Sequence, residues 1–147
     1  MYKHILVPTD GSEISDNAIL AAVKLAKVLG AKLTGFFAME DYPVSPFADW
    51  VPGSIPSPEE FRVAQEALAK QYLGILAREA KAAGVPYAID FAPSLSPYKA
   101  IIHAAEEKGC DLILMASHGR RGMGGLVLGS ETNKVLTHCK IPVLVYR

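Results

Sequence analysis

The sequence contains very little cysteine and no excess of charge of either sign. Its two cysteines, Cys110 and Cys139, are too few and too far apart for a zinc knuckle or a redox pair, which favours a cytoplasmic protein with reduced thiols. Its 15 lysine and arginine residues balance 15 aspartate and glutamate residues. Because binding to nucleic acids or membrane surfaces usually depends on a basic excess, neither partner is expected.

Long apolar runs are also missing. Pro8 stops the N-terminal run, which is far too short for a signal peptide, and no other run approaches the length of a membrane span. The sequence has neither the Gly-x-Ser-x-Gly elbow of hydrolases nor a Gly-x-x-x-x-Gly-Lys-Ser/Thr phosphate loop. The histidines show no metal-ligand spacing. No catalytic residue and no metal ligand is therefore predicted.

Strand and helix signals alternate along the chain, and half of the residues are apolar. This composition suits a single domain, residues 1–147, with a proper core. Helically spaced apolar residues stop at Gly30, Gly84 and Gly109, and a fourth short helix is expected from Glu131 to His138. Ser57, with Glu60 in a capping box, and Ser96 are expected to cap the second and third helices. Short apolar runs predict strands at residues 3–8, 32–39, 86–92, 111–116 and 141–146.

This alternation predicts an α/β fold with a doubly wound, Rossmann-like sheet of five parallel strands and helices on both faces. Ligands of such sheets lie outside the carboxyl ends of the strands, at the point where the strand order reverses. If the first and fourth strands are neighbours there, residues 8–12 face the loop that follows Ala116.

The loop from Ser117 to Ser130 is the most informative segment. It is rich in glycine and has no acidic residue, while Arg120 and Arg121 bring positive charge. Glycines let N–H groups point at a ligand, and the following helix adds free N–H groups and the positive end of its dipole. The loop therefore favours a phosphorylated ligand. The alternative is an ordinary turn with two solvated arginines.

Two further side chains have more than one interpretation. Asp10 either turns the chain before the first helix or accepts hydrogen bonds from a ribose, with a bridging cation as another partner, and these roles do not exclude each other. His118 lies inside the glycine-rich loop, so it either contacts a phosphate or has no ligand role.

These residues resemble the universal stress protein family. The resemblance runs from Lys3-His4-Ile5-Leu6-Val7-Pro8-Thr9-Asp10-Gly11-Ser12 to Ile141-Pro142-Val143-Leu144-Val145 and covers nearly the whole chain. Nucleotide-binding members carry Gly, two residues, Gly, nine residues, Gly, and then Ser or Thr. Gly119 and Gly129-Ser130 match this motif, whereas Ala116 replaces its first glycine.

The resemblance implies that the chain binds ATP or another adenine nucleotide, with or without Mg²⁺. Gly119, Gly129 and Ser130 would cradle the phosphates together with the N–H of Glu131. Asp10 would meet the ribose. Similar proteins act as stress-response modules, so the implied role is regulatory.

The same resemblance places the adenosine. Pro8 and Thr9 would lie beside it, and Ala38 would offer backbone groups to the adenine. Met115 and Ala116 would form the pocket floor. Together with His118 and Arg120, which the loop itself suggests, the complete predicted binding set is Pro8, Thr9, Asp10, Ala38, Met115, Ala116, His118, Gly119, Arg120, Gly129, Ser130 and Glu131.

The last strand, from Ile141 to Tyr146, is the expected homodimer contact. Similar proteins pair this strand across a two-fold axis. An apolar strand would leave an exposed edge if it were unpaired, and Pro142 restricts it to an edge position or to its own first residues.

Three functions remain open: a nucleotide-binding regulatory module, a stress-linked dimer without a ligand, and a slow ATP hydrolase, in that order of preference. A hydrolase would need a positioned base, for which Asp10, His118 and Glu131 are the candidates. The proline- and aromatic-rich segment from Glu40 to Ser57 is either a surface loop packed on the second helix or, less favoured, a lid over the adenine side.

Overall fold

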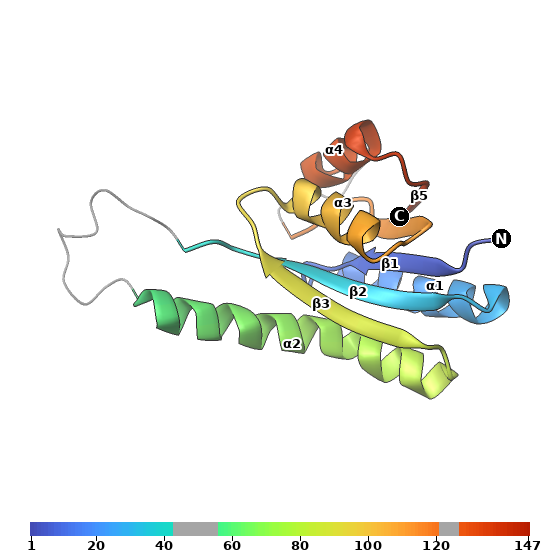
Figure 1. Ribbon diagram of the computed structural model, residues 1–147, viewed down its shortest axis with the longest axis horizontal. Helices are drawn as coiled ribbons and strands as arrows, with labels where there is room; N and C mark the ends of the chain where they lie inside the picture. The colour runs from blue at the N-terminus through green and yellow to red at the C-terminus, as the bar shows by residue number, and fades with distance from the viewer. Residues whose placement is uncertain (43–55, 121–126) are drawn as a thin grey trace.

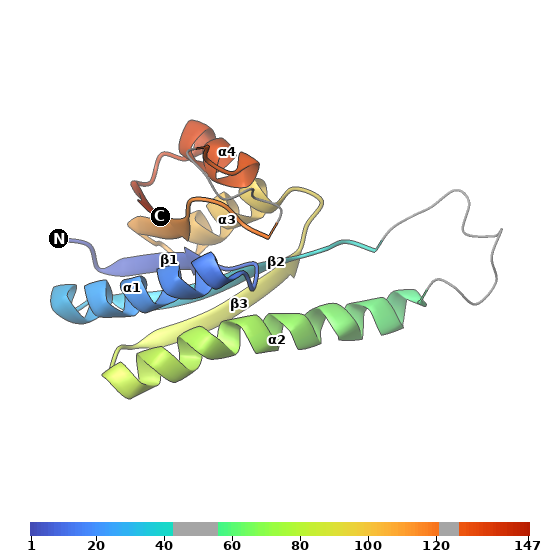
Figure 2. The same cartoon turned by 180° about the vertical axis from the view of Figure 1, so that it is seen from behind.

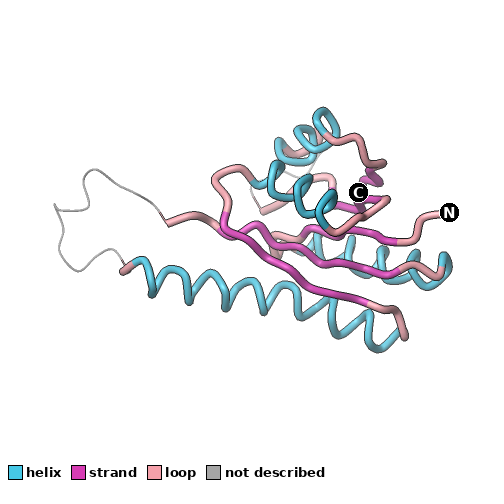
Figure 3. Tube along the Cα trace, in the orientation of Figure 1, coloured by secondary structure: helices cyan, strands magenta, loops and turns pink. Residues whose placement is uncertain are grey.

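The computed structural model describes residues 1–42, 56–120 and 127–147. Strands and helices alternate along the chain, as Figure 3 shows in magenta and cyan. The strands are β1 (His4–Pro8), β2 (Lys32–Met39), β3 (Tyr87–Pro93), β4 (Leu112–Ala116) and β5 (Val143–Tyr146). The helices are α1 (Glu13–Leu29), α2 (Pro58–Ala83), α3 (Pro97–Glu107) and α4 (Ser130–His138).

The five strands form one parallel sheet in the order β3-β2-β1-β4-β5 (Figure 1). The predicted fold class is confirmed. The first and fourth strands are neighbours, because Leu6 of β1 pairs with Ile113 of β4, so the condition under which residues 8–12 face the loop after Ala116 is met. The strand order reverses at β1. The carboxyl ends of β1 and β4 therefore meet where this fold places ligands.

Helices cover both faces of the sheet, as predicted. Helices α1 and α2 pack on one face, and α3 and α4 on the other (Figures 1 and 2). Side chains of β1 alternate between the two cores, with Ile5 and Val7 facing α1 and Leu6 in the cluster under α3 and α4. All five residues of β1 are buried, which explains why the strand reads as a continuous apolar run.

Four of the five predicted strand starts are shifted by one or two residues. β1 begins at His4 and β3 at Tyr87, each one residue later than predicted. β4 begins at Leu112 because the Asp111 carboxylate accepts hydrogen bonds from the N–H groups of Lys3 (2.8 Å) and His4 (2.9 Å) just before the strand. β5 begins at Val143 because Pro142 has no N–H to donate, although its carbonyl accepts from Ile113 (2.9 Å).

Helix ends follow the predicted chemistry with one exception. Ser57 and Glu60 form a capping box at the start of α2, and Gly84 ends that helix at φ 71°. Ser96 was expected to cap α3, but its side chain makes no cap bond. The N–H of Tyr98 instead donates to Glu131 of α4 (2.8 Å), so a residue distant in sequence caps this helix.

The predicted loop from Glu40 to Ser57 is described only at its ends. The ring of Tyr42 packs edge-on against Phe61 of α2, with 5.6 Å between centroids, and its hydroxyl donates to the carbonyl of Pro56 (2.9 Å). Phe47 and Trp50 lie outside the described residues. Among the helices described, none is both long and apolar enough to cross a membrane.

Candidate functional site

Two loops meet at the carboxyl edge of the sheet through Asp10 and the segment after β4. Asp10 Oδ1 accepts the N–H of Ser12 (3.0 Å), and Asp10 Oδ2 accepts the N–H of Arg120 (2.7 Å). A Cβ on Gly119 would lie 2.1 Å from Asp10 Oδ2. The absence of a side chain at Gly119 is therefore what allows the two loops to approach so closely.

The Asp10 carboxylate is stabilised in its charged form. Burial alone would raise its pKa, but the hydrogen bonds from Ser12 and from the Arg120 N–H outweigh burial, so the pKa of Asp10 is lowered. Its bond to Ser12 is the turn role predicted for this residue. An ionised carboxylate also keeps lone pairs that can accept hydroxyl groups, so the ribose role stays a prediction.

The start of α4 presents backbone N–H groups without partners. The N-cap residue Gly129 supplies no side-chain cap, and the first intrahelical bond runs from Asn133 N–H to its carbonyl (3.0 Å). Within the described ranges, the N–H groups of Ser130, Glu131 and Thr132 have no acceptor. Free first-turn amides and the positive end of the helix dipole make this end of α4 suitable for an anion.

Gly129 itself is held tightly against the preceding loop. Its N–H donates to the carbonyl of Ser117 (2.7 Å), and a Cβ would lie 3.0 Å from His118 Cα. The ring Nδ1 of His118 lies 3.1 Å from the hydroxyl oxygen of Ser117. Gly129 has φ −60°, so the constraint at this position is space and not backbone conformation.

The end of β2 exposes backbone groups beside β1. Strand β1 pairs with β2 only as far as Pro8 and Phe36, and Thr9 N–H then donates to the carbonyl of Phe36 (2.9 Å). Ala38 comes two residues later, so its N–H and C=O point the same way as those of Phe36, past the end of β1. Ala38 therefore has the free backbone groups that its predicted contact with adenine requires.

The two predicted floor residues face opposite sides of the sheet. Met115 belongs to the cluster under α3 and α4, whereas Ala116 belongs to the cluster with α1, as the alternation along a strand requires. The carbonyl of Ala116 accepts the hydroxyl of Thr132 (2.9 Å), and its φ is not positive. Its methyl group therefore occupies the α1 core, and its backbone does not need glycine.

The hydroxyl of Thr9 is used inside the turn between β1 and α1. Its Oγ1 lies 3.0 Å from Ser15 Oγ and accepts the N–H of Gly11 (3.1 Å). Thr9 is buried, so its side chain shapes the turn from within. Pro8 ends β1 directly before it and is buried too.

Arg120 is anchored away from the crevice by a contact that the sequence did not reveal. Its guanidinium carbon lies 4.8 Å from the ring centroid of Tyr72 in α2. That ring lies against Gly11, where a Cβ would be 2.3 Å from a ring carbon and φ is +77°. Tyr72 carried only a helix-core signal in the sequence, and nothing in the spacing links it to Arg120.

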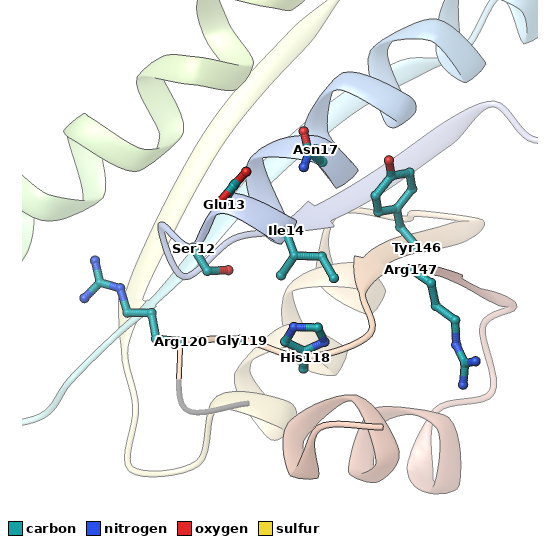
Figure 4. A pocket seen from close by; sticks show the side chains of 9 residues that line it. All are labelled: Ser12, Glu13, Ile14, Asn17, His118, Gly119, Arg120, Tyr146 and Arg147. Atoms are coloured by element: carbon teal, nitrogen blue, oxygen red, sulfur yellow. The ribbon is translucent and has the colours of Figure 1, made fainter. Parts of the chain in front are cut away.

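A cavity of about 430 Å³ opens between the first turns of α1 and the loop after β4 (Figure 4). Figure 4 shows Ile14 pointing toward His118, while the Arg120 side chain points away. Only His118, Gly119 and Arg120 of the predicted binding set line this cavity. It opens on the α1 side, whereas α4 lies on the opposite face of the sheet (Figure 1).

The site contains no preformed metal centre in the part of the chain that the structure describes, where no three His, Cys, Asp or Glu side chains gather to hold an ion. The Asp10 carboxylate lies between the two loops, where its oxygens accept the N–H groups of Ser12 and Arg120.

The sequence profile of the Universal stress protein family matches residues 1–147. The chain belongs to this family. Among its relatives, the universal stress protein YxiE of Bacillus subtilis is 33% identical, with the full length of both chains covered.

Solved structures of universal stress proteins share the fold. The universal stress protein UspA from Lactobacillus plantarum superimposes with a TM-score of 0.84 at 26% identity, covering 99% of this chain and 98% of its own. A universal stress protein in complex with cAMP superimposes with a TM-score of 0.71 at 27% identity, covering 99% and 97%. The Rossmann-like arrangement of helices and strands is thus that of its family.

Proposed function

We propose that this universal stress protein binds an adenine nucleotide at the carboxyl ends of β1, β2 and β4 and acts as a homodimeric regulatory module. One observation carries the proposal: the first-turn N–H groups of α4, which have no acceptor among the described residues, and the ionised Asp10 carboxylate lie at the same edge of the sheet. Amides that attract an anion and a carboxylate that accepts hydroxyl groups are complementary to a phosphorylated ribose.

The two ends of a nucleotide have matching partners. The N–H groups of Ser130 and Glu131 would receive the phosphates, with Gly119 and Gly129 leaving space beside them. The backbone of Ala38, which projects past the end of β1, would pair with the adenine edge. His118 is in contact with Gly129 just before α4, and from there its ring would approach the phosphates.

The comparison with a family member in complex with cAMP supports an adenine nucleotide over other phosphorylated ligands. The identity of the adenylate is open between ATP, with or without Mg²⁺, and forms with fewer phosphates. The free cysteines Cys110 and Cys139 suit a role in the reducing cytoplasm.

The homodimer would form through the outer edge of β5. Carbonyls of Pro142 and Tyr146 point toward β4, so the backbone groups of Val143 and Val145 point outward. In the described sheet, β5 has a neighbour on one side only, and Leu144 is 42% exposed. Pairing with a second copy would satisfy this edge and cover the apolar side chain.

A binding experiment tests the nucleotide site. The protein is purified without added nucleotide, denatured, and examined by mass spectrometry for released adenylate. Calorimetric titrations with AMP and with ATP, each with and without Mg²⁺, then measure affinity. Release of an adenylate or saturable binding is expected.

Gly129→Val is the matching variant, because a side chain there crowds His118 and Ser117. Gly74→Val is its control, since a Cβ on that α2 glycine meets no atom within 4 Å. Binding should be lost in Gly129→Val and kept in Gly74→Val, with both proteins folded by circular dichroism. Unchanged binding in Gly129→Val would mean that the phosphates are not held at the start of α4.

A further inference from the structure

The side chain of Glu131 lies between the starts of two helices. Glu131 is the residue after Ser130 in the first turn of α4, and its Oε2 accepts the N–H of Tyr98 in the first turn of α3 (2.8 Å). Ser96, the N-cap residue of α3, provides no side-chain bond of its own. Glu131 therefore acts as the missing cap of α3, supplied by the neighbouring helix.

The carboxylate of Glu131 is held at both oxygens. Its Oε1 accepts a hydrogen bond from Lys134 Nζ (2.9 Å), and the same ammonium group lies 5.6 Å from the ring centroid of Tyr98. The side chains of Glu131 and Lys134 are 36% and 49% exposed. Because the pair is partly solvated, Lys134 offsets only part of the negative charge.

A fixed negative charge thus stands beside the amides that would receive phosphate. The N–H groups of Ser130 and Glu131 attract whichever phosphate reaches them, but the Glu131 carboxylate repels every negative charge on the ligand. We place a ligand charge about 7 Å from the carboxylate, a little more than the roughly 5.4 Å pitch of one helical turn. With an effective dielectric constant between about 40 and 80, each additional ligand charge at about 7 Å lowers affinity by about three- to sevenfold.

We propose that Glu131 makes this crevice select adenylates of low charge, so that a nucleoside monophosphate binds more tightly than a triphosphate. The proposal rests on the adenine-nucleotide site proposed above. It assigns the side chain of Glu131 a specificity role in addition to the phosphate contact of its N–H group. Lys134 tunes the same preference in the opposite direction.

Titration calorimetry with AMP and ATP at low ionic strength, without Mg²⁺, measures this preference. Glu131→Gln keeps an acceptor for the Tyr98 N–H and removes the charge. Lys134→Met keeps Glu131 and removes its neutralising partner. Glu79→Gln is the control, because it changes the net charge equally from the last part of α2, where Glu79 pairs with Arg78.

The wild-type protein is expected to bind AMP more tightly than ATP. Glu131→Gln should raise the affinity for ATP relative to AMP by about threefold or more. Lys134→Met should shift the ratio the other way, and Glu79→Gln should leave it unchanged. Because Lys134→Met leaves the bond to Tyr98 intact, it reports on charge even if Glu131→Gln loosens α3.

The possible outcomes distinguish a failure of the proposed selectivity from a failure of the proposed nucleotide site. If all four proteins bind AMP and ATP with the same ratio of affinities, the selectivity is overturned and the nucleotide site stands. A wild-type preference for ATP that Glu131→Gln does not increase also overturns it. If the wild-type protein binds no adenylate, the proposed function falls and the selectivity with it.

Discussion

Gly119→Ala creates the closest contact of any alanine substitution at the described glycines. A Cβ at this position would lie 2.1 Å from Asp10 Oδ2 and 3.2 Å from Asp10 Cγ. Non-bonded carbon and oxygen atoms do not approach to the shorter distance, so either the carboxylate or the loop has to move by about 1 Å. The variant therefore separates the two loops without changing any charge.

The expected effect follows from the bond that this movement breaks. Asp10 Oδ2 accepts the Arg120 N–H at 2.7 Å. A hydrogen bond to a charged group contributes about 1.5–3 kcal/mol, and Asp10 displaced from its position would lose ribose bonds of the same kind. Adenylate affinity in Gly119→Ala should fall by about ten- to hundredfold, since a tenfold change corresponds to about 1.4 kcal/mol.

Calorimetric titration with AMP, combined with urea unfolding, measures both consequences. Gly74→Ala is the matched control, because this α2 glycine has open space around it and alanine is the better helix former. The control should bind AMP as the wild-type protein does and be more stable by about 0.5–1 kcal/mol. A folded Gly119→Ala protein that binds AMP with wild-type affinity would refute the role given to Asp10.

Three further changes have defined outcomes. Val145→Pro removes an outward N–H of β5 but no hydrogen bond to β4. Light scattering should therefore find a monomer for Val145→Pro and a dimer for the control Val145→Ala. A dimeric Val145→Pro protein would mean that the interface lies elsewhere. Ala116→Gly should bind AMP with an affinity within about twofold of the wild-type value. Its free energy of unfolding should fall by about 0.5–1 kcal/mol, because the Ala116 methyl group lies in the α1 core. Tenfold tighter AMP binding would show that this methyl group obstructs the ligand. Burial, together with the charge of Lys32, lowers the pKa of His4, so the unfolded chain takes up this proton more readily than the folded protein. The free energy of unfolding should therefore fall as the pH drops below about 6.5, and urea titrations should show a smaller fall in His4→Gln; equal pH dependence in both proteins would exclude His4 as its source.

The parallel sheet and the helices on both of its faces could be predicted because they depend on local patterns and on general rules of parallel sheets. The apolar run of β1 and the proline that ends it define a buried central strand. Gly30 and Gly84 end α1 and α2 with left-handed backbone, as the end of each apolar stripe predicted. The predicted boundaries differ from the structure by one or two residues, and at Asp111 and Pro142 a side-chain bond or a missing N–H lies at the strand start.

Contacts between distant segments were beyond sequence reasoning. The capping of α3 by Glu131 replaces an expected cap by Ser96, and no local pattern joins positions so far apart. The stacking of Arg120 on Tyr72 likewise depends on how α2 crosses the sheet. The loop glycines predicted N–H groups that point at a ligand, whereas the structure shows that the Asp10 carboxylate occupies the space beside Gly119.

The unequal lengths of β1 and β2 have a consequence for how the fold makes room at its centre. β1 stops opposite Phe36, whereas β2 continues beside β3 to Met39. The three extra residues of β2 leave a space about 10 Å long beyond the end of β1 in the middle of the sheet. The end of β1 closes this space at one end, and β2 borders it on one side. If evolution lengthened β1 past Pro8, the added residues would fill this space. The short β1 therefore leaves room for a ligand at the edge of the sheet, and the packed core needs no internal cavity.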